Sequence, residues 1–328
     1  MTESLLKNCE LFVTNRDILK VNFKWDSSQM HPLCASLCAE RDIEADPEKI
    51  RACKEIIKEN TGLLSEFKGT VLLALATILS FETDPEGKFH QVTESYAALR
   101  KEFHSSPYLP LSAFMIADMA DSFNYEGIVD KAKRIYKKMK EKHPFLTSSE
   151  DAGFAVLFAL SDIEEDEAIR RAEECYSLLK GRFFSSDSVQ ALSHALAMGA
   201  DTSEEKVART LEIYEKLKEK GCKYGTGPEL ATLGMLSLSG SDIDTIVEDV
   251  AALDQHLTTV KGFGTFGTGK AQRLMYASFL TANGYKKSGL SSAIKASLVN
   301  SVTSLIIAEQ VAVIAIIAAT SASSSTSS

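Results

Sequence analysis

The residues best suited to acid–base chemistry stand at or near the starts of four apolar segments. They are Asp151, Gln190, Glu229 and Arg273, and His194 follows one turn into the second segment. Two carboxylates from neighbouring segments could act as general acid and general base. Acidic residues at a helix start also complement the helix dipole, which needs no catalysis. The candidate catalytic residues, with capping and core packing as the alternative, are Asp151, Glu229, His194 and Arg273.

A glycine-rich segment from Gly264 to Lys270 comes close to the phosphate-binding pattern Gly-x-x-x-x-Gly-Lys-Ser/Thr. In that pattern the loop amides and a helix start hold phosphate, while the hydroxyl binds Mg²⁺. Here Ala271 replaces the hydroxyl residue, and segment 246–257 has a helical pattern where the motif needs a strand. We interpret the segment as a connection between helices and expect no cofactor. The candidates for weaker anion binding are Gly264, Gly267, Gly269 and Lys270.

His31, Cys34 and Cys38 are spaced to share one face of a helix, and imidazole and thiolate are ligands that zinc prefers. The same spacing suits an apolar face, because a free cysteine packs as a small hydrophobic residue. No second cluster of ligands is evident in the sequence. These three residues are therefore the metal candidates, and burial in a core is the interpretation that we favour.

Four tyrosines recur at an almost constant interval, and this interval predicts the architecture. Tyr96, Tyr136 and Tyr176 are each 40 residues apart, and Tyr214 follows after 38. A fixed period of this size indicates a repeated structural unit. Within each unit, a segment with one charged and one apolar face precedes an almost wholly apolar segment. This order predicts an amphipathic helix followed by a buried helix.

The predicted helices follow this alternation along the chain. The first helix of each pair is expected near 47–60, 87–103, 127–142, 166–181, 204–220 and 243–258. The second is expected at 70–79, 111–120, 152–160, 190–198, 229–238 and 272–282. Residues 3–20 and 28–40 are expected to form a further pair. No segment shows the sustained alternation of a β-strand, so the predicted fold class is all-α.

We expect these pairs to stack as tandem helical-hairpin repeats in a single domain, residues 1–320. Residues 1–45 would form N-terminal helices, 46–287 the hairpin repeats and 288–320 an apolar C-terminal helix. Residues 321–328 are a serine-rich tail that we expect to be disordered. The sequence leaves two forms open, because packing sets the small rotation from one repeat to the next. They are an open α-solenoid, or superhelix, and a closed α/α toroid.

The composition limits the partners and the compartment. The formal net charge is -9, so the chain lacks the basic character expected of a nucleic-acid binder. The N-terminus lacks the apolar core of a secretory signal, and the six cysteines are expected to be reduced; both indicate a cytoplasmic protein. Polar residues interrupt the apolar segment 298–319, which predicts a buried helix. A membrane tether is the alternative for this segment.

Several short motifs along the chain occur together in one family. They are Glu59-Asn60-Thr61-Gly62, Phe67-Lys68-Gly69, Phe145-Leu146-Thr147-Ser148, Gln190-Ala191-Leu192-Ser193-His194, Ala197-Met198-Gly199, Lys261-Gly262-Phe263-Gly264, Arg273-Leu274-Met275 and Ile306-Ile307-Ala308-Glu309-Gln310. With these motifs the chain resembles the bacterial family called domain of unknown function 4003, up to about residue 319. The resemblance implies a bacterial, cytoplasmic protein of unassigned biochemistry, and it transfers no catalytic residues.

These observations favour a binding protein over an enzyme. The leading hypothesis is a cytoplasmic repeat or scaffold protein that holds a protein or peptide partner on its inner or concave surface. The alternative is an α/α-toroid enzyme that acts on a saccharide or another small neutral substrate with carboxylates of the inner helices. We expect no nucleic-acid partner and no membrane partner.

Overall fold

The described part of the chain consists of helices and their connections. The structure is a computed structural model that describes residues 2–63, 65–264 and 268–287. These ranges contain α-helices and short 3₁₀ helices but no strand, which confirms the all-α prediction. No helix within them has the length and apolar character needed to cross a membrane. The predicted helix at 288–320, the tail at 321–328 and Gly267 lie outside the described residues.

The chain divides into two compact units, which are described separately below. One contains Thr14–Glu165, here called the 14–165 unit. Among the described residues, the other contains those up to Val13 together with Asp166–Lys287, and it is here called the 166–287 unit after its main segment. The expected single domain of residues 1–320 would join both units, and it stays a prediction.

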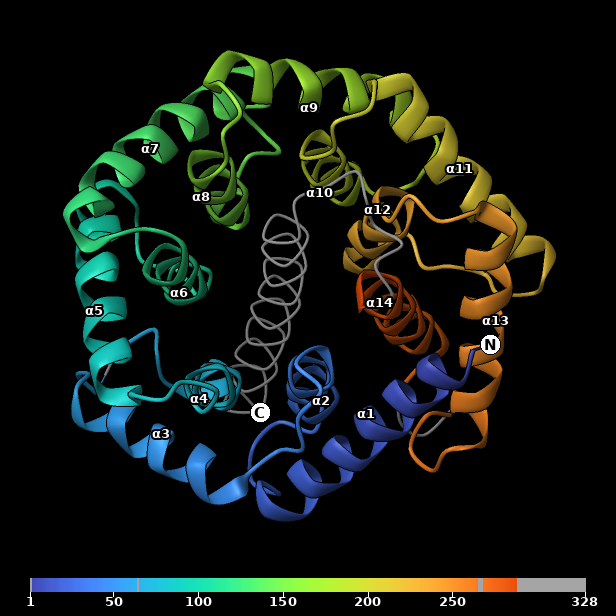
Figure 1. The fold of residues 1–328 in the computed structure, drawn as a ribbon. Helices are drawn as coiled ribbons and strands as arrows, with labels where there is room; N and C mark the ends of the chain where they lie inside the picture. The colour runs from blue at the N-terminus through green and yellow to red at the C-terminus, as the bar shows by residue number, and fades with distance from the viewer. Residues whose placement is uncertain (1, 64, 265–267, 288–328) are drawn as a thin grey trace, which may run out of the picture. The chain divides into compact units, whose positions relative to one another are not determined.

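In the 14–165 unit, helices pack as pairs in two layers (Figure 1). The pairs α3–α4, α5–α6 and α7–α8 are in contact; α3 contacts α5, α5 contacts α7, α2 contacts α4 and α6 contacts α8. The odd-numbered helices are called first-layer helices below, and the even-numbered ones second-layer helices. The helices are α1 (Glu3–Asn22), α2 (Met30–Glu40), α3 (Pro47–Glu59), η1 (Gly69–Val71), α4 (Leu72–Leu79), α5 (Pro85–Glu102), α6 (Leu109–Met119), η2 (Ser122–Asn124), α7 (Tyr125–Lys142), η3 (Ser149–Asp151) and α8 (Ala152–Leu160).

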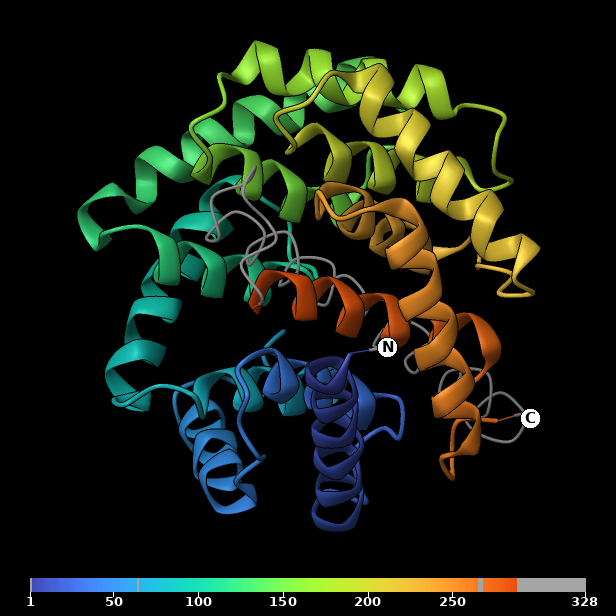
Figure 2. The ribbon, with the colours of Figure 1, turned by 45° about the vertical axis from the view of Figure 1, so that its right-hand side comes forward.

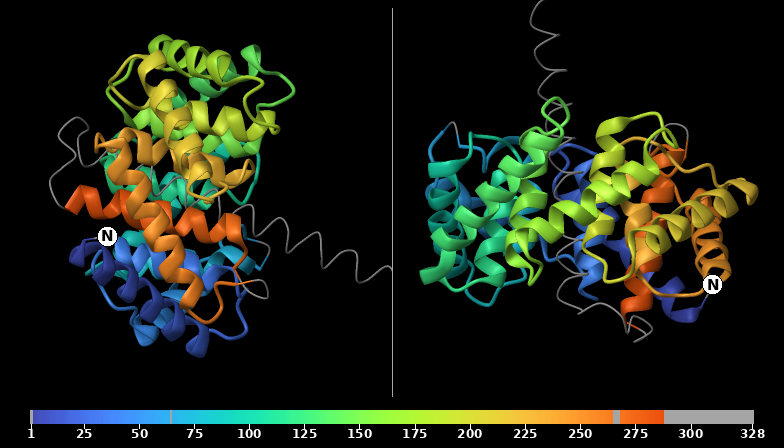
Figure 3. Two further views of the ribbon diagram at one scale, coloured as in Figure 1. Left: turned by 90° about the vertical axis from the view of Figure 1, so that its right-hand side faces the viewer. Right: turned by 90° about the horizontal axis from the view of Figure 1, so that it is seen from above.

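The 166–287 unit has the same two-layer packing, which can be followed in Figures 2 and 3. The pairs α11–α12 and α13–α14 are in contact, α11 contacts α13, and α12 contacts both α10 and α14. The start of α1 belongs to this unit, where the Phe12 ring lies 5.7 Å from the Phe263 ring, between centroids. The helices are α9 (Glu165–Leu179), α10 (Ser186–Ala197), α11 (Ser203–Glu219), η4 (Pro228–Leu230), α12 (Ala231–Leu238), α13 (Ile243–Thr259) and α14 (Lys270–Lys287).

The apolar pattern of each helix explains its layer. In α7, Val129, Ala132, Ile135 and Met139 are buried at helical spacing, so one stripe of the helix faces the second layer. In α8, every residue of the range 152–159 is buried, as expected for a helix that is apolar on all sides. The predicted order of an amphipathic helix followed by an apolar helix is therefore found in this pair.

Capping residues set where the helices begin. The Asp46 carboxylate accepts hydrogen bonds from the backbone amides of Glu48 and Lys49 at the start of α3. Thr202 and Glu205 form a reciprocal capping box at the start of α11. The second helix predicted at 190–198 begins four residues earlier, at Ser186, because Ser185 is its N-cap. Caps of this kind satisfy backbone amides that the helix leaves without partners.

Three of the four spaced tyrosines meet a phenylalanine edge to face. The ring centroids of Tyr96 and Phe67 are 4.8 Å apart, those of Tyr136 and Phe103 are 5.5 Å apart, and those of Tyr214 and Phe183 are 5.0 Å apart. Each phenylalanine follows the first-layer helix that precedes the helix of its tyrosine. The periodic tyrosines thus join one first-layer helix to the connection after the previous one.

Candidate functional site

A second periodic feature ties each first-layer helix to the end of its second-layer partner. Five residues before Tyr136, Tyr176 and Tyr214 stands a basic residue. Each donates to backbone carbonyls in the last turn of the second-layer helix or just after it: Lys131 to Ser161 and Ile163, Arg171 to Gly199, and Arg209 to Ser237 and Ser241. The last carbonyls of a helix lack intrahelical donors, so a cation there satisfies them and complements the helix dipole.

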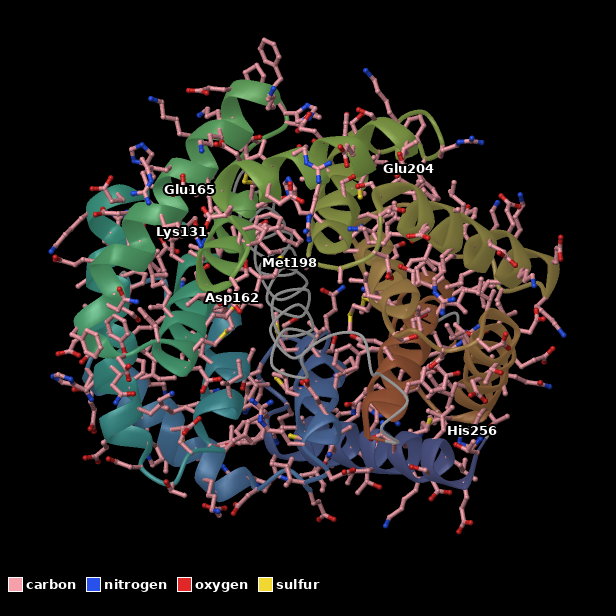
Figure 4. The ribbon with its side chains drawn as sticks, turned by 45° about the horizontal axis from the view of Figure 1, so that its top comes forward. Lys131, Asp162, Glu165, Met198, Glu204 and His256 are labelled. Atoms are coloured by element: carbon pink, nitrogen blue, oxygen red, sulfur yellow. The ribbon has the colours of Figure 1, made fainter. Side chains whose placement is uncertain are left out.

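Figure 4 labels one of these positions, Lys131 on α7, together with Asp162 and Glu165 in the segment after α8. Glu165 pairs with Arg134 at 2.7 Å and with Lys138 at 3.3 Å, so further charges of α7 also bind this segment. Sequence reasoning missed these clamps. The signal that would have revealed them is a basic residue five positions before three of the four spaced tyrosines.

In α13 both periodic positions hold an aspartate instead. Asp249 stands 40 residues after Arg209, and Asp254 stands 40 residues after Tyr214. Both are buried, with exposed fractions of 5% and 7%. The Asp249 carboxylate accepts a hydrogen bond from the Tyr285 hydroxyl of α14 at 2.9 Å. The α13–α14 pair is therefore joined by buried aspartates at the positions where α7, α9 and α11 carry a basic residue and a tyrosine.

Arg273 is the partner of the second aspartate. Its Nε lies 2.6 Å from Oδ1 of Asp254 and its Nη2 lies 3.2 Å from Oδ2, a two-pronged ion pair. Nη1 donates to the carbonyl oxygen of Phe263 at 3.3 Å. Both side chains are only 10% exposed. The guanidinium proposed from the sequence as a catalytic group thus holds α14 against α13 and is already neutralised by a carboxylate.

The connection between α11 and α12 lies beside this ion pair. Burial is the main cause that raises the pKa of Cys222, and the nearby Asp254 carboxylate adds to it, while Lys270 and Arg273 oppose it. Burial likewise raises the pKa of Tyr224 to about 12, and its hydroxyl shares a hydrogen bond with Thr232. Both groups therefore stay protonated near neutral pH, which makes Cys222 a poor nucleophile.

Glu229 belongs to η4, which contacts both α10 and α14. These two helices carry His194 and Arg273, so the structure brings together the elements of three candidate catalytic residues. The Glu229 carboxylate folds back onto its own connection: a Cβ added to Gly225 would lie 1.6 Å from Oε1 of Glu229. Glycine at position 225 is what leaves room for this carboxylate.

His194 is buried in the core, and Asp151 takes part in capping a helix. His194 is 3% exposed within the apolar helix α10. Asp151 lies in the 14–165 unit, apart from the other three candidates along the chain. Its Oδ2 accepts the backbone amide of Ser148 at 2.9 Å in a capping box, which is the alternative role that the sequence allowed for it.

The metal candidates are core residues of α2. The Nε2 of His31 lies 3.0 Å from the backbone oxygen of Phe23. Burial is the main cause that raises the pKa of Cys34 and of Cys38 to about 12, so both thiols stay protonated. Within the described ranges, no three His, Cys, Asp or Glu side chains are grouped so that they could hold a metal ion. His31, Cys34 and Cys38 thus pack as core residues of α2, which is the interpretation favoured from the sequence.

The anion candidates fall at the start of α14. Lys270 Nζ donates to the backbone carbonyl of Gly221 at 2.9 Å, near the end of α11. The amide of Thr268 donates to the carbonyl of Gly262 at 2.8 Å, which closes the connection before α14. A Cβ at Gly264 or Gly269 would meet no atom within 4 Å. The lysine of the glycine-rich segment thus serves as a further helix-end clamp.

Six hydroxyl residues of the second-layer helices are bonded within their own helix. Each donates to a carbonyl three or four residues earlier, at 2.7–3.0 Å. Such bonds let a polar side chain sit in an apolar environment without another partner. The residues are Ser36, Thr77, Ser112, Ser193, Ser237 and Thr281.

Comparison with known proteins agrees with the motifs seen in the sequence. The model of a family of proteins of unknown function, DUF4003, matches residues 15–311. The chain belongs to this family. It is similar to the uncharacterized protein YeaA of Bacillus subtilis (strain 168), with 26% identity over 257 residues, which cover 75% of this chain and 77% of the relative. No solved structure matches the chain.

Proposed function

We propose that this protein is a cytoplasmic binding or scaffold protein that holds a protein or peptide partner. The observation that carries the proposal is that polar side chains of the second-layer helices are already engaged in hydrogen bonds or ion pairs within the protein. Six of the hydroxyls are bonded within their own helices, and Arg273 is paired with Asp254. These groups support packing, and none is poised as an acid–base pair. The inference from a helical architecture to binding is one of analogy.

The proposed partner surface differs from the one expected from the sequence. That expectation placed the partner on the inner or concave surface, which the second-layer helices were expected to line. In α8 and α12, however, the ranges 152–159 and 231–238 are buried throughout. These stretches leave no exposed side chain for a partner. We therefore place the partner on the first-layer helices and the connections, where the charged side chains are exposed.

We also propose that the helix pairs are copies of one repeated unit. The edge-to-face tyrosine contacts and the basic clamps support this, because both recur at the interval seen in the sequence. Small-angle X-ray scattering separates the two forms of such an architecture. An open superhelix of this chain length gives a larger radius of gyration than a closed toroid.

Partner binding is tested by chemical crosslinking of the full chain in bacterial cells, followed by calorimetric titration with each purified candidate partner. The proposal expects one partner to bind saturably and to lose affinity when exposed first-layer lysines are reversed, as in K137E/K140E. The matched control is K206M, because Lys206 is 2% exposed and cannot reach a partner. Equal loss in both variants, or no saturable partner, would contradict the proposal.

The alternative function is hydrolysis of a saccharide or another small neutral substrate. It is favoured by one observation: η4, which carries Glu229, contacts the helices of His194 and Arg273. Hydrolysis of a panel of aryl glycosides by the full chain tests it. The alternative expects turnover that falls at least about 100-fold in E229Q. Turnover unchanged in E229Q and in H194N, or no turnover at all, removes this alternative.

A further inference from the structure

The most exposed large apolar side chains gather in one kind of connection. Six of them exceed 70% exposure: Val21, Trp25, Leu63, Phe123, Phe145 and Phe184. All except Phe123 lie at the end of a first-layer helix or in the connection from it to the second layer. Trp25, Leu63 and Phe145 belong to the 14–165 unit and are 92%, 92% and 98% exposed.

Neighbouring connections of this kind adjoin one another in the 14–165 unit. Asp26, in the connection after α1, pairs with Lys54 of α3 at 2.8 Å. Ser105, after α5, donates to Glu66, after α3, at 2.6 Å. The Tyr136 ring packs on Phe103, and its hydroxyl donates to the carbonyl of Ser148, which joins the last two connections. We call residues 23–29, 60–63, 65–68, 103–108 and 143–148 the apolar-tip edge.

Lysines surround the tips of this edge. Lys24 Nζ lies 5.5 Å from the centroid of the Trp25 ring, and both Lys140 and Lys142 are exposed in the last turn of α7, just before Phe145. The connections from the second layer back to the first are acidic instead, as in Glu82, Asp84 and Glu86. Acidic side chains also occur at the apolar-tip edge, as in Asp26 and Glu66. The last turns of the first-layer helices α1, α3, α5 and α7 nevertheless carry basic residues, in agreement with the helix dipole.

We propose that the apolar-tip edge docks onto an anionic lipid surface. Separate apolar side chains, each projecting alone from a loop, suit insertion between lipid headgroups, whereas a protein interface needs a contiguous apolar core. The tryptophan ring is amphipathic and favours the membrane interface. The lysines beside the tips supply attraction to anionic headgroups. The proposal concerns the surface of a bilayer only, and it does not depend on the protein partner proposed above.

The chain provides its own probe for this proposal, because Trp25 is its single tryptophan. The full-length protein is titrated with vesicles of phosphatidylcholine alone and of phosphatidylcholine with 30% phosphatidylserine, while tryptophan emission and co-sedimentation are recorded. We expect a blue shift and co-sedimentation with the anionic vesicles only, both weakened by high salt. In L63S/F145S and in K140Q/K142Q the apparent affinity should fall at least about 10-fold.

The matched control is F123S, because Phe123 is 88% exposed but lies in a connection from the second layer to the first. Every variant keeps residues 288–328, so any vesicle binding by segment 298–319 is common to all. The proposal is overturned if anionic vesicles cause no shift, or if F123S weakens binding as much as L63S/F145S does. A blue shift that depends on protein concentration without lipid would overturn it in favour of self-association.

Discussion

At the scale of single residues, the pair of Arg273 and Asp254 shows how a residue suited to catalysis can serve the fold. A buried carboxylate is costly unless a cation and further hydrogen bonds compensate it. Here the two-pronged contact with Arg273 provides that compensation, and the third nitrogen of the guanidinium satisfies a backbone carbonyl. An arginine at this position suggested a catalytic role from the sequence. Its contacts with Asp254 and with a backbone carbonyl show that it stabilises the fold.

We predict that R273M destabilises the protein by about 3–5 kcal/mol, because it leaves the buried Asp254 carboxylate without its cation. The double variant D254N/R273M should recover part of this loss. The measurement is the free energy of unfolding from urea titration. The control is R170A: Arg170 pairs with Glu167 on the exposed surface, where ion pairs contribute little. Equal effects of R273M and R170A would show that the buried pair is unimportant.

Because the protein buries protonated thiols, we predict that its free energy of unfolding falls at alkaline pH. Burial raises the pKa of Cys34 to about 12, far above the value of about 8.5 for an unfolded thiol. The folded state therefore favours the protonated thiol. This contribution is complete below about pH 8.5 and is lost as the pH rises toward 12. At pH 10 the loss should reach about 2 kcal/mol for this thiol.

The measurement is the free energy of unfolding of the wild-type protein and of C34A at pH 7.5 and pH 10. C34A should lose less stability between the two values than the wild type, because it has no thiol to ionise on unfolding at this position. Other ionising groups contribute equally to both proteins and cancel in the difference. An identical pH dependence of the two would refute the prediction.

At the scale of elements, glycines allow α10 and α12 to approach each other closely. An ideal Cβ on Gly199 would lie 2.4 Å from Cδ2 of Leu238, the last residue of α12. A Cβ on Gly234, within α12, would lie 3.0 Å from Cδ1 of Leu192 in α10. The close packing at this junction therefore depends on glycine at positions 199 and 234. The sequence pattern alone does not reveal this dependence.

We predict that G199A destabilises the protein by about 1–3 kcal/mol through overpacking against Leu238. L238A added to G199A should relieve part of that strain. The control is G62A, because a Cβ on Gly62 would meet no atom within 4 Å. G62A should be neutral or slightly stabilising, since alanine has less freedom in the unfolded chain. Thermal unfolding of the four proteins checks this order.

The basic clamp is a second device at this scale. Arg209 is half-buried in α11 and donates to one carbonyl in the last turn of α12, that of Ser237, and to one just after it, that of Ser241. R209M should cost about 1.5–3 kcal/mol, because carbonyls at the end of a helix lose a charged donor. The comparison is K137M, since Lys137 of α7 is 77% exposed and has no such carbonyls within reach. Hydrogen exchange should show faster opening of the α12 end in R209M only.

At the scale of the whole molecule, neighbouring first-layer helices are coupled through the tyrosine–phenylalanine contacts. A double-mutant cycle on Phe183 and Tyr214, with alanine at each position, should give a coupling energy of about 0.5–1.5 kcal/mol. Y214F should retain most of this coupling, because the contact is between ring edge and ring face. A coupling energy of zero would mean that the spaced tyrosines do not link neighbouring helices.

Much of the helical framework was predictable, because it follows from local patterns. The helix predicted at 152–160 has the bounds found for α8, and the one near 47–60 is α3 with a one-residue difference at its end. The site was less predictable. Asp249 and Asp254 occupy periodic positions, yet their roles depend on Tyr285 and Arg273 of another helix. A period in one sequence shows that a position recurs, but it does not show which partner meets it.

By itself the sequence determined the all-α class, the alternation of amphipathic and apolar helices, and the interval at which tyrosines recur, since these follow from periodicity and propensity within short segments. It also carried the motifs of the DUF4003 family. Only the tertiary structure decided that Arg273 is neutralised by Asp254 and that Lys270 holds a helix end. The reason is that a charge acquires its role from the groups that surround it, and these come from distant parts of the chain.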